Sequence, residues 1–357
     1  MITGNKGEWS EIYALFKVLG DKNLYSGDAS LNKVEDLFYP ILKIIRNESG
    51  EKYEYEIDGD IVVISGGVEN IRLSYKIFQE QSIKLLSKIK EETGVFGLPE
   101  IEAFMSSVNV VTLKAKSSIK TDIRIVIYDQ RISQSAELGF SIKSKLGGES
   151  TLLNAGNTTN FIYKIAGFSG TVHDIERINQ IESRSKIKER LDEIKKLGGE
   201  LEFISPEKDI FKNNLVLIDS LLPNLLAELL KQYYTSNLSR TKELTEEISR
   251  INPLSFDTQH SHSFYEYKVK RFLTDIALGM MPSKVWGGIY DATGGYLIVK
   301  ENGDVLCYHI YNRNQFEDYL FNNTKIETAS STRHNFAQIY QQENDLFFKL
   351  NLQIRFI

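Results

Sequence analysis

The chain has few of the residues and patterns that mark secreted, disordered or membrane proteins. One cysteine among 357 residues allows no intramolecular disulfide and no cysteine zinc site. Six prolines and no low-complexity tract argue against a long structureless linker. No stretch approaches the roughly 18 consecutive apolar residues of a membrane span, and the first residues lack the basic-then-apolar pattern of a signal peptide. We therefore expect a cytoplasmic protein with no membrane partner.

Positive charge is also scarce. The 43 Lys and Arg residues are outnumbered by 48 Asp and Glu, which gives a net charge of −5. This balance argues against a broad, non-specific coat for nucleic acid, although a local basic cleft can lie on an acidic body. The single cysteine, Cys307, lies in the alternating run DVLCYHI, which is typical of a strand. We expect it to be a small buried hydrophobic residue.

The sequence does contain a succession of helix and strand patterns that predicts an α/β fold. Apolar residues at helical spacing predict helices over 7–21, 33–46, 76–93, 100–107, 172–197 and 264–278, and one or two more over 215–251. Alternating residues predict strands over 119–129, 137–145, 159–165, 336–342 and 346–356, and hairpins over 53–65 and 296–310.

Two strand patterns near the middle of the chain carry polar residues on one face. In IKTDIRIVIYD the isoleucines alternate, and Asp122 and Arg124 lie on the opposite face. In ELGFSIKSK the apolar residues again alternate, with Ser141 and Lys143 facing the other way. A short polar loop separates the two runs, which predicts an antiparallel hairpin.

Such a strand pair suits metal-assisted cleavage of a phosphodiester. Carboxylates hold a hard cation, the cation meets the charge that develops on the phosphate, and a lysine orients the attacking water. Asp122 and Lys143 supply these groups, and the carbonyl of Ile142 can also face the metal. A plainer interpretation of the same residues is a cross-strand salt bridge.

The arrangement resembles the PD-(D/E)XK nuclease superfamily, in which an acidic strand residue precedes an acid-X-Lys triplet. Here the triplet is Ser141-Ile142-Lys143, so serine replaces the acid and a second carboxylate must come from elsewhere. Restriction enzymes that cut around CCGG cores include members with this substitution and a glutamate on a helix. The run of Lys6-Gly7, three residues and then Glu11 resembles the opening helix of several nucleases in this superfamily, in which that glutamate reaches the metal. Glu8 is the alternative, one turn earlier.

Longer runs are similar to the HpaII-type restriction endonucleases, from residue 4 to 356. They include NKGEWSEIYALFKVL, FSIKSKLGGESTLLNAGNTTNFIY, FLTDIALGMMPSKVWGGIYDATGGYLIVKENGDVLCYHIYN and LNLQIRF. The resemblance implies a type II restriction endonuclease that uses Mg²⁺ to cut double-stranded DNA at a short palindrome, with CCGG as the reference target. It also implies a homodimer on DNA and a cognate DNA methyltransferase as functional partner.

The resemblance further implies a restriction-endonuclease-like mixed sheet flanked by helices. We expect a nuclease core over 1–170, a helical section over 171–253, and a C-terminal α+β region over 254–357 that recognises DNA. The implied roles are Asp122, Glu11 and the Ile142 carbonyl as metal ligands and Lys143 as the residue that positions the water. Ser141 marks the vacated acid position and is suited to hydrogen-bond a water on the metal.

The same residues also allow other interpretations. The serine at 141 also suits a non-catalytic DNA-binding module with a decayed nuclease fold, and a repair nuclease without sequence specificity is a second alternative. His260 and His262 suggest metal ligands, but two histidines in a polar loop are more often solvated. Lys268, Lys270 and Arg271 suit phosphate contacts or a solvated helix face equally well. We expect base readout to come from Arg, Lys, Asn or Gln side chains in the major groove.

Overall fold

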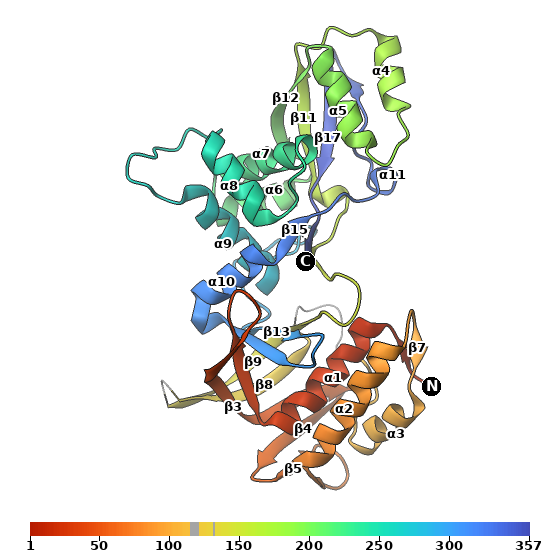
Figure 1. Ribbon diagram of the computed structural model, residues 1–357, viewed down its shortest axis with the longest axis vertical. Coiled ribbons are helices and arrows are strands. Elements are labelled where there is room, and N and C mark those ends of the chain that lie inside the picture. The colour runs from red at the N-terminus through yellow and green to blue at the C-terminus, as the bar shows by residue number, and fades with distance from the viewer. Residues whose placement is uncertain (115–120, 131–132) are drawn as a thin grey trace. The chain divides into compact units, whose positions relative to one another are not determined.

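The computed structural model describes residues 1–114, 121–130 and 133–357 and contains two compact units (Figure 1). Unit 1 comprises Met1–Ser150 and Tyr290–Tyr319, and unit 2 comprises Thr151–Ile289 and Leu320–Ile357. The chain thus leaves unit 1, forms most of unit 2, and returns to complete unit 1. The three-part division expected from the sequence stays a prediction.

Unit 1 is built on strands with helices packed against them. Its strands are β1 (Thr3–Gly4), β2 (Asn23–Gly27), β3 (Lys33–Glu48), β4 (Glu51–Asp58), β5 (Ile61–Ser65), β6 (Ile71–Ser74), β7 (Phe96–Gly97), β8 (Ile123–Asp129), β9 (Gln134–Ser144), β13 (Gly295–Val299) and β14 (Val305–His309). Its helices are α1 (Lys6–Asp21), α2 (Tyr75–Glu91), α3 (Pro99–Ser107), a 3-10 turn (Ile310–Asn312) and the start of α10 (Arg313–Asn322).

Nine of these strands form one mixed sheet in the order β2-β14-β13-β9-β8-β3-β4-β5-β6, and β2 also pairs with β3. Strand β9 lies in the interior of the sheet, antiparallel to β8 and parallel to β13. Helices α1 and α2 pack side by side against the sheet and share its apolar core (Figure 1). The predicted mixed sheet flanked by helices is confirmed.

Helix α1 has clear start and stop signals. The side chain of Asn5 accepts a hydrogen bond from the backbone N–H of Glu8, whose carboxylate accepts one from the backbone N–H of Asn5. This reciprocal capping box satisfies two donors that the first turn leaves open. Lys22 ends the helix in a left-handed conformation. The predicted apolar stripe, which runs from Trp9 to Leu19, is fully buried and fixes which face of α1 meets the sheet.

The helix predicted over 33–46 is wrong, because this segment is the long strand β3. Its apolar residues fit both periods, but Pro40 lies in the middle, where a helix would lose a backbone hydrogen bond and clash with the preceding turn. The strand instead pairs with β2 through Lys33–Pro40 and with β8 and β4 further on. These long-range pairings decide the structure of the segment.

Most other predicted elements are confirmed. The hairpin about Asp58-Gly59 is β4–β5, and the hairpin about Asn302-Gly303 is β13–β14. The antiparallel hairpin of β8 and β9 is also present, although residues 119 and 120 of its first predicted strand lie outside the described part of the chain. Strands β13 and β14 join the sheet of unit 1 because β13 pairs with β9. No local sequence pattern predicted this pairing.

Unit 2 combines helices with two smaller sheets, ordered β12-β11-β17-β16 and β10-β18-β15. The predicted helix over 172–197 is two helices, and the helical region over 215–251 belongs to three. The strands are β10 (Thr151–Leu153), β11 (Asn160–Ala166), β12 (Glu200–Pro206), β15 (Thr324–Ile326), β16 (Tyr340–Gln342), β17 (Asp345–Asn351) and β18 (Ile354–Phe356). The helices are α4 (Val172–Asn179), α5 (Lys186–Lys196), α6 (Asp209–Ile218), α7 (Leu222–Thr235), α8 (Thr241–Ile251), α9 (Phe264–Leu278), α11 (Ser331–His334) and a 3-10 turn (Asn157–Thr159).

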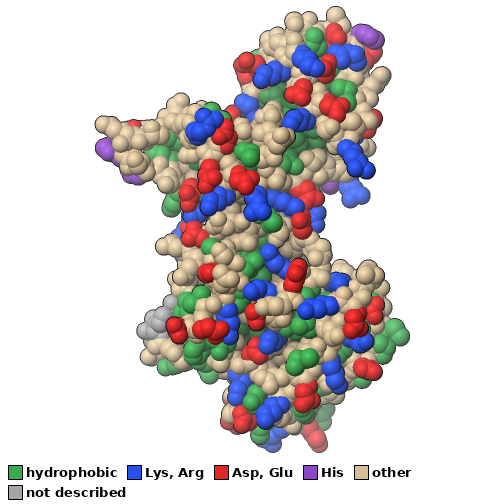
Figure 2. Space-filling view, viewed as in Figure 1, with side chains coloured by type: hydrophobic (Ala, Val, Ile, Leu, Met, Phe, Trp, Pro, Cys, Tyr) green, Lys and Arg blue, Asp and Glu red, His purple; other side chains and the backbone are tan. Residues whose placement is uncertain are grey.

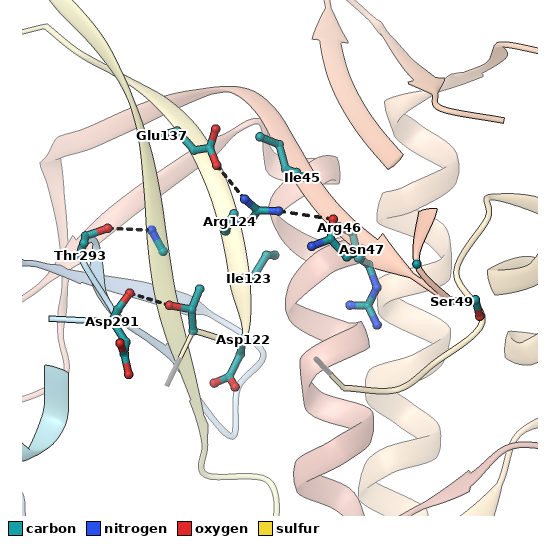
Figure 3. A pocket seen from close by; sticks show the side chains of 13 residues that line it. Ile45, Arg46, Asn47, Ser49, Asp122, Ile123, Arg124, Glu137, Asp291 and Thr293 are labelled. Atoms are coloured by element: carbon teal, nitrogen blue, oxygen red, sulfur yellow. Dashed lines mark hydrogen bonds and ion pairs between the residues drawn. The ribbon is translucent and has the colours of Figure 1, made fainter. Parts of the chain in front are cut away.

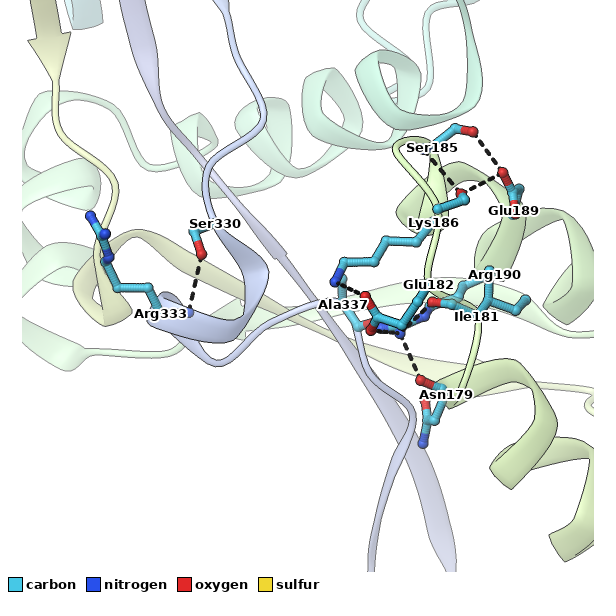
Figure 4. A network of polar contacts seen from close by, with 11 residues as sticks. Asn179, Ile181, Glu182, Ser185, Lys186, Glu189, Arg190, Ser330, Arg333 and Ala337 are labelled. Atoms are coloured by element: carbon cyan, nitrogen blue, oxygen red, sulfur yellow. Dashed lines mark hydrogen bonds and ion pairs between the residues drawn. The ribbon is translucent and has the colours of Figure 1, made fainter.

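A buried arginine holds part of unit 2 together (Figure 4). Arg190 of α5 donates to the carbonyl oxygens of Ala337 at 2.6 Å, Asn179 at 2.6 Å and Ile181 at 2.9 Å. Burial lowers its pKa, and the nearby charge of Glu182 opposes that effect. Because buried guanidinium groups need such partners, Arg190 fixes the turn after α4 against the segment that carries Ala337.

The burial of Cys307 and the character of the helices also bear on the predictions from sequence. Cys307 lies fully buried in β14, as the alternating pattern predicted. Within the ranges that the structure describes, every helix is too short or too polar to cross a membrane.

Candidate functional site

The predicted strand residues come together where β8 begins beside β9. One oxygen of Asp122, Oδ2, accepts a 3.0 Å hydrogen bond from the Ser141 hydroxyl and a 2.6 Å hydrogen bond from the backbone N–H of Ile142. Asp122 also donates its own N–H to the carbonyl of Phe140. Ser141 is 5% exposed, so its hydroxyl is committed to orienting the carboxylate. The residue in the vacated acid position therefore holds Asp122.

The backbone of Ile142 faces the same carboxylate. In an extended strand the N–H and C=O groups of one residue point to the same side. Since the N–H of Ile142 donates to Asp122, the carbonyl of Ile142 points to the same side of β9. Ile142 lies past the end of the β8–β9 pairing, whose last residue pair is Ile123 with Phe140. Across the described ranges, no hydrogen bond to Oδ1 of Asp122 is found. The Oδ1 atom of Asp122 and the carbonyl oxygen of Ile142 are therefore the candidate ligands that this strand pair offers to a cation.

Lys143 is within the electrostatic influence of both Asp122 and Glu11. Burial lowers the pKa of its ammonium group, while the charges of Asp122 and Glu11 both raise it. Burial is the larger influence. The Lys143 Nζ atom also lies 5.5 Å from the ring centre of Tyr296, within range of a cation–π interaction. The structure therefore brings Lys143 close to both predicted carboxylates.

Glu11 reaches the site from α1. The residue is partly exposed, but its Oε2 atom is buried from solvent. Its neighbour in the chain, Ser10, is fully buried and shares a 2.7 Å hydrogen bond with the hydroxyl of Ser144, the neighbour of Lys143. The Ser144 hydroxyl also accepts from the backbone N–H of Leu146. A side-chain contact thus ties helix α1 to strand β9 next to the two candidate residues, Glu11 and Lys143.

Glu8, the alternative to Glu11, is engaged elsewhere. One of its oxygens accepts from Asn5 in the capping box, and the other forms a 2.7 Å ion pair with Lys114. The hydrogen bond from Lys114, followed by that from the Asn5 backbone, lowers the pKa of Glu8. Both oxygens serve local structure, which favours Glu11 as the helix ligand.

Two clefts adjoin these residues. A cleft of about 800 Å³ is lined by Glu11, Ile142, Lys143 and the glycine pair Gly147-Gly148, among others. A second cleft of about 620 Å³ begins at Asp122 and extends over the outer face of β8 (Figure 3). The candidate site therefore lies between two open regions, with the helix glutamate on one and the strand aspartate on the other.

The donor set fits a hard divalent cation. Two carboxylates and one carbonyl are oxygen ligands of the kind that Mg²⁺ prefers, with water and phosphate oxygens completing its shell. Over 1–114, 121–130 and 133–357, no group of three or more His, Cys, Asp or Glu residues is placed to hold a metal ion. A cation that demands an all-protein cage or nitrogen and sulfur ligands fits this site poorly.

Other sequence candidates fare differently. His260 and His262 lie on an exposed loop, with their ring centres 6.2 Å apart and no third ligand in the described ranges. Lys268 pairs with Asp219, and Lys270 pairs with Glu266 at 2.5 Å. Both lysines pair with acidic neighbours within unit 2, and their side chains are only 14% and 17% exposed, so they serve the local structure of α9.

Sequence reasoning missed two contributors to the site. Tyr296 lies opposite Ser141 in the parallel β13–β9 pairing, so its ring comes beside Lys143. The Ser10–Ser144 contact was also missed. No local signal marks Tyr296, because its position depends on a pairing between distant segments. Ser144 offered a weak signal, as a small polar residue on the inward side of its strand.

Comparison with known proteins is consistent over the whole chain. The sequence profile of the family described as HpaII restriction endonuclease matches residues 5–356. The chain is 48% identical over 359 aligned positions to the Type II restriction enzyme HpaII of Haemophilus parainfluenzae, covering 99% of each protein. No solved structure matches the chain.

Proposed function

Because the chain belongs to the HpaII restriction endonuclease family, and is thus a type II restriction enzyme, we propose that it cuts DNA with Glu11, Asp122 and Lys143. The geometry around Lys143 carries this proposal: Glu11 and Lys143 line one cleft, and Asp122 is hydrogen-bonded to Ile142, the residue before Lys143. A helix acid, a strand acid and a strand lysine in one place form the constellation that metal-assisted phosphodiester hydrolysis requires.

Magnesium is the cation that we assign to the site. Asp122, Glu11 and the carbonyl of Ile142 would hold it, which leaves positions for water and phosphate oxygens. When bound, the cation supplies positive charge where negative charge develops on the phosphate. Ser141 and the Ile142 N–H keep Asp122 turned toward this position through its Oδ2 atom.

Lys143 would act on the attacking water. Its Nζ atom donates hydrogen bonds that orient the water toward the phosphorus. Because burial lowers the pKa of Lys143, its neutral form is more accessible than that of an exposed lysine, and Nζ can then accept a proton from the water. The carboxylates of Asp122 and Glu11 favour the protonated form that results.

The substrate that we propose is double-stranded DNA with a short palindromic site, and CCGG is the first sequence to test. A palindrome has twofold symmetry, which a homodimer matches with two equivalent active sites. An enzyme that cuts such a site in the cytoplasm endangers the DNA of its own cell. We therefore also propose a cognate methyltransferase that modifies the same sequence, as a functional partner.

Digestion of plasmid DNA with Mg²⁺, followed by sequencing of the ends, tests the proposal. We expect discrete fragments whose ends share one palindrome. Asp122→Ala and Lys143→Ala should abolish cutting and leave a folded protein, while the exposed controls Asp58→Ala and Lys76→Ala should cut normally.

Three outcomes would contradict parts of this proposal. A shifted band without cutting would indicate a non-catalytic DNA-binding module, and smeared or structure-dependent products would indicate a repair nuclease. Full activity in either site variant would show that the site lies elsewhere.

A further inference from the structure

Arg124 lies on the outward face of β8, two residues after Asp122, which directly precedes the strand, and both residues line the cleft of about 620 Å³ (Figure 3). Side chains two apart on a strand are separated by about 6.6 Å. This separation is close to that of neighbouring phosphates along one strand of DNA. A backbone that places one phosphate at Asp122 can therefore bring the next one to Arg124.

The present partners of Arg124 hold it loosely. Its Nη1 atom lies 3.1 Å from a carboxylate oxygen of Glu137, and its Nη2 atom donates at 3.4 Å to the side chain of Asn47. The Arg124 and Glu137 side chains are 37% and 47% exposed, so their ion pair contributes little to stability. These contacts use two of the five N–H donors of a guanidinium. A phosphate can replace the Glu137 carboxylate without leaving the arginine uncompensated.

The neighbouring arginine in the cleft is committed to the fold. Arg46 is buried, pairs with Glu48 and donates to the carbonyl oxygen of Thr112 at 2.6 Å. At the tip of the β3–β4 hairpin, Gly50 leaves the wall of the cleft open, since a Cβ there would meet nothing within 4 Å. Among the lining residues that the structure describes, Arg124 is thus the arginine that the fold does not commit, and the cleft wall is open at Gly50.

We propose that Arg124 binds the phosphate next to the one that is cut, on the Asp122 side, and that Asn47 orients its guanidinium. This inference rests on the proposed nuclease function. The fork of a guanidinium matches two phosphate oxygens, and such charge-assisted pairs are strong. Figure 2 shows acidic and basic side chains interspersed over the described surface in view. The contact adds affinity and register without reading sequence.

Salt dependence of DNA binding tests the assignment. The full chain is titrated with a duplex that carries the site found by end sequencing, and with a duplex altered at one base pair, in Ca²⁺ in place of Mg²⁺. Arg124→Ala should weaken both complexes equally, by roughly tenfold or more. It should also reduce the slope of log affinity against log salt by about 0.9. Arg72→Ala, an exposed arginine of β6 in the same sheet, is the matched control and should change neither quantity.

Two further variants keep the result interpretable. Arg124→Lys should retain the salt slope, since the charge remains, and recover part of the affinity. Glu137→Gln removes the competing carboxylate and should tighten binding to both duplexes. An unchanged slope in folded Arg124→Ala would overturn the inference, and so would a loss confined to the cognate duplex, which would mean base reading. A wild-type chain that does not cut DNA would instead overturn the proposed function.

Discussion

The carboxylate of Asp122 accepts a 2.6 Å hydrogen bond from the backbone N–H of Ile142, so the acid before β8 is tied to the strand that carries Lys143. The acid and the lysine therefore cannot move independently. Ser141 donates a second hydrogen bond to the same oxygen. The serine that replaces the acid of the triplet thus has a structural role, which is to orient Asp122.

Replacing Ser141 with alanine should slow cutting without preventing it. The Ile142 N–H would still hold Asp122, but the carboxylate would gain rotational freedom, and losses of this kind are typically about 10- to 100-fold. Single-turnover cleavage rates measure the effect, with DNA affinity expected to stay near the wild-type value. Ser135→Ala, an exposed serine of the same strand, is the control. Rates within twofold of wild type would show that the Ser141 hydroxyl does not position Asp122.

The two glutamates of α1 should separate stability from activity. Glu8→Ala removes half of the capping box and the ion pair with Lys114, which should cost about 1 kcal/mol of unfolding free energy and leave cutting intact. Glu11→Ala should reduce cutting by more than about 100-fold, because it removes the proposed metal ligand, and it should leave the helix cap untouched. Denaturant unfolding and cleavage assays on both variants give the comparison. The reverse pattern would identify Glu8 as the ligand.

The Ser10–Ser144 contact should matter for the metal more than for the fold. Ser10→Ala breaks the bond between helix and strand, so Glu11 would be less well placed and half-maximal cutting should need more Mg²⁺. Ser144→Ala should have the same effect, and the double variant should be no worse than either single one. Ser82→Ala removes a buried hydroxyl that bonds within α2 and should leave the Mg²⁺ dependence unchanged. Equal shifts in all variants would indicate general loosening.

Cys307 should make stability fall in alkali. Burial raises the pKa of its thiol above the ordinary value of 9.0, so the folded protein keeps the proton after the unfolded chain has released it. The contribution of the buried thiol to the free energy of unfolding is therefore fully present below pH 9. Above pH 9 it declines by about 1.4 kcal/mol per pH unit. The difference in unfolding free energy between wild type and Cys307→Ala at pH 8 and pH 10 isolates this effect. Rapid labelling of the folded thiol at neutral pH would contradict its burial.

Local patterns predicted the elements that depend on near neighbours. The alternation in IKTDIRIVIYD and ELGFSIKSK was sufficient to place Ser141 on the same side as Asp122, because side chains alternate whenever a strand forms. The period of 3.6 likewise placed Trp9 in the core. The positions of these residues follow from the period of the helix or strand that contains them.

Elements decided by distant partners could not be predicted in this way. The segment from Lys33 to Arg46 has apolar spacing that suits a helix, and Pro40 was the one residue that argued against a helix. The segment is strand β3. Tyr296 reaches the site through parallel pairing across a long insertion, which leaves no trace in nearby residues. The hydrogen bond from Ser141 to Asp122 depends on side-chain rotamers, which strand alternation does not specify.

The parallel pairing of β13 with β9 has a consequence for how the enzyme is made. A ribosome finishes β9 at Ser144, and it must then synthesise residues 151–289 before β13 emerges to cover the open edge. Closing such a long loop is slow. We expect an unfinished polypeptide to lack Tyr296 beside Lys143, so that cutting of the producing cell's chromosome is delayed until synthesis is nearly complete.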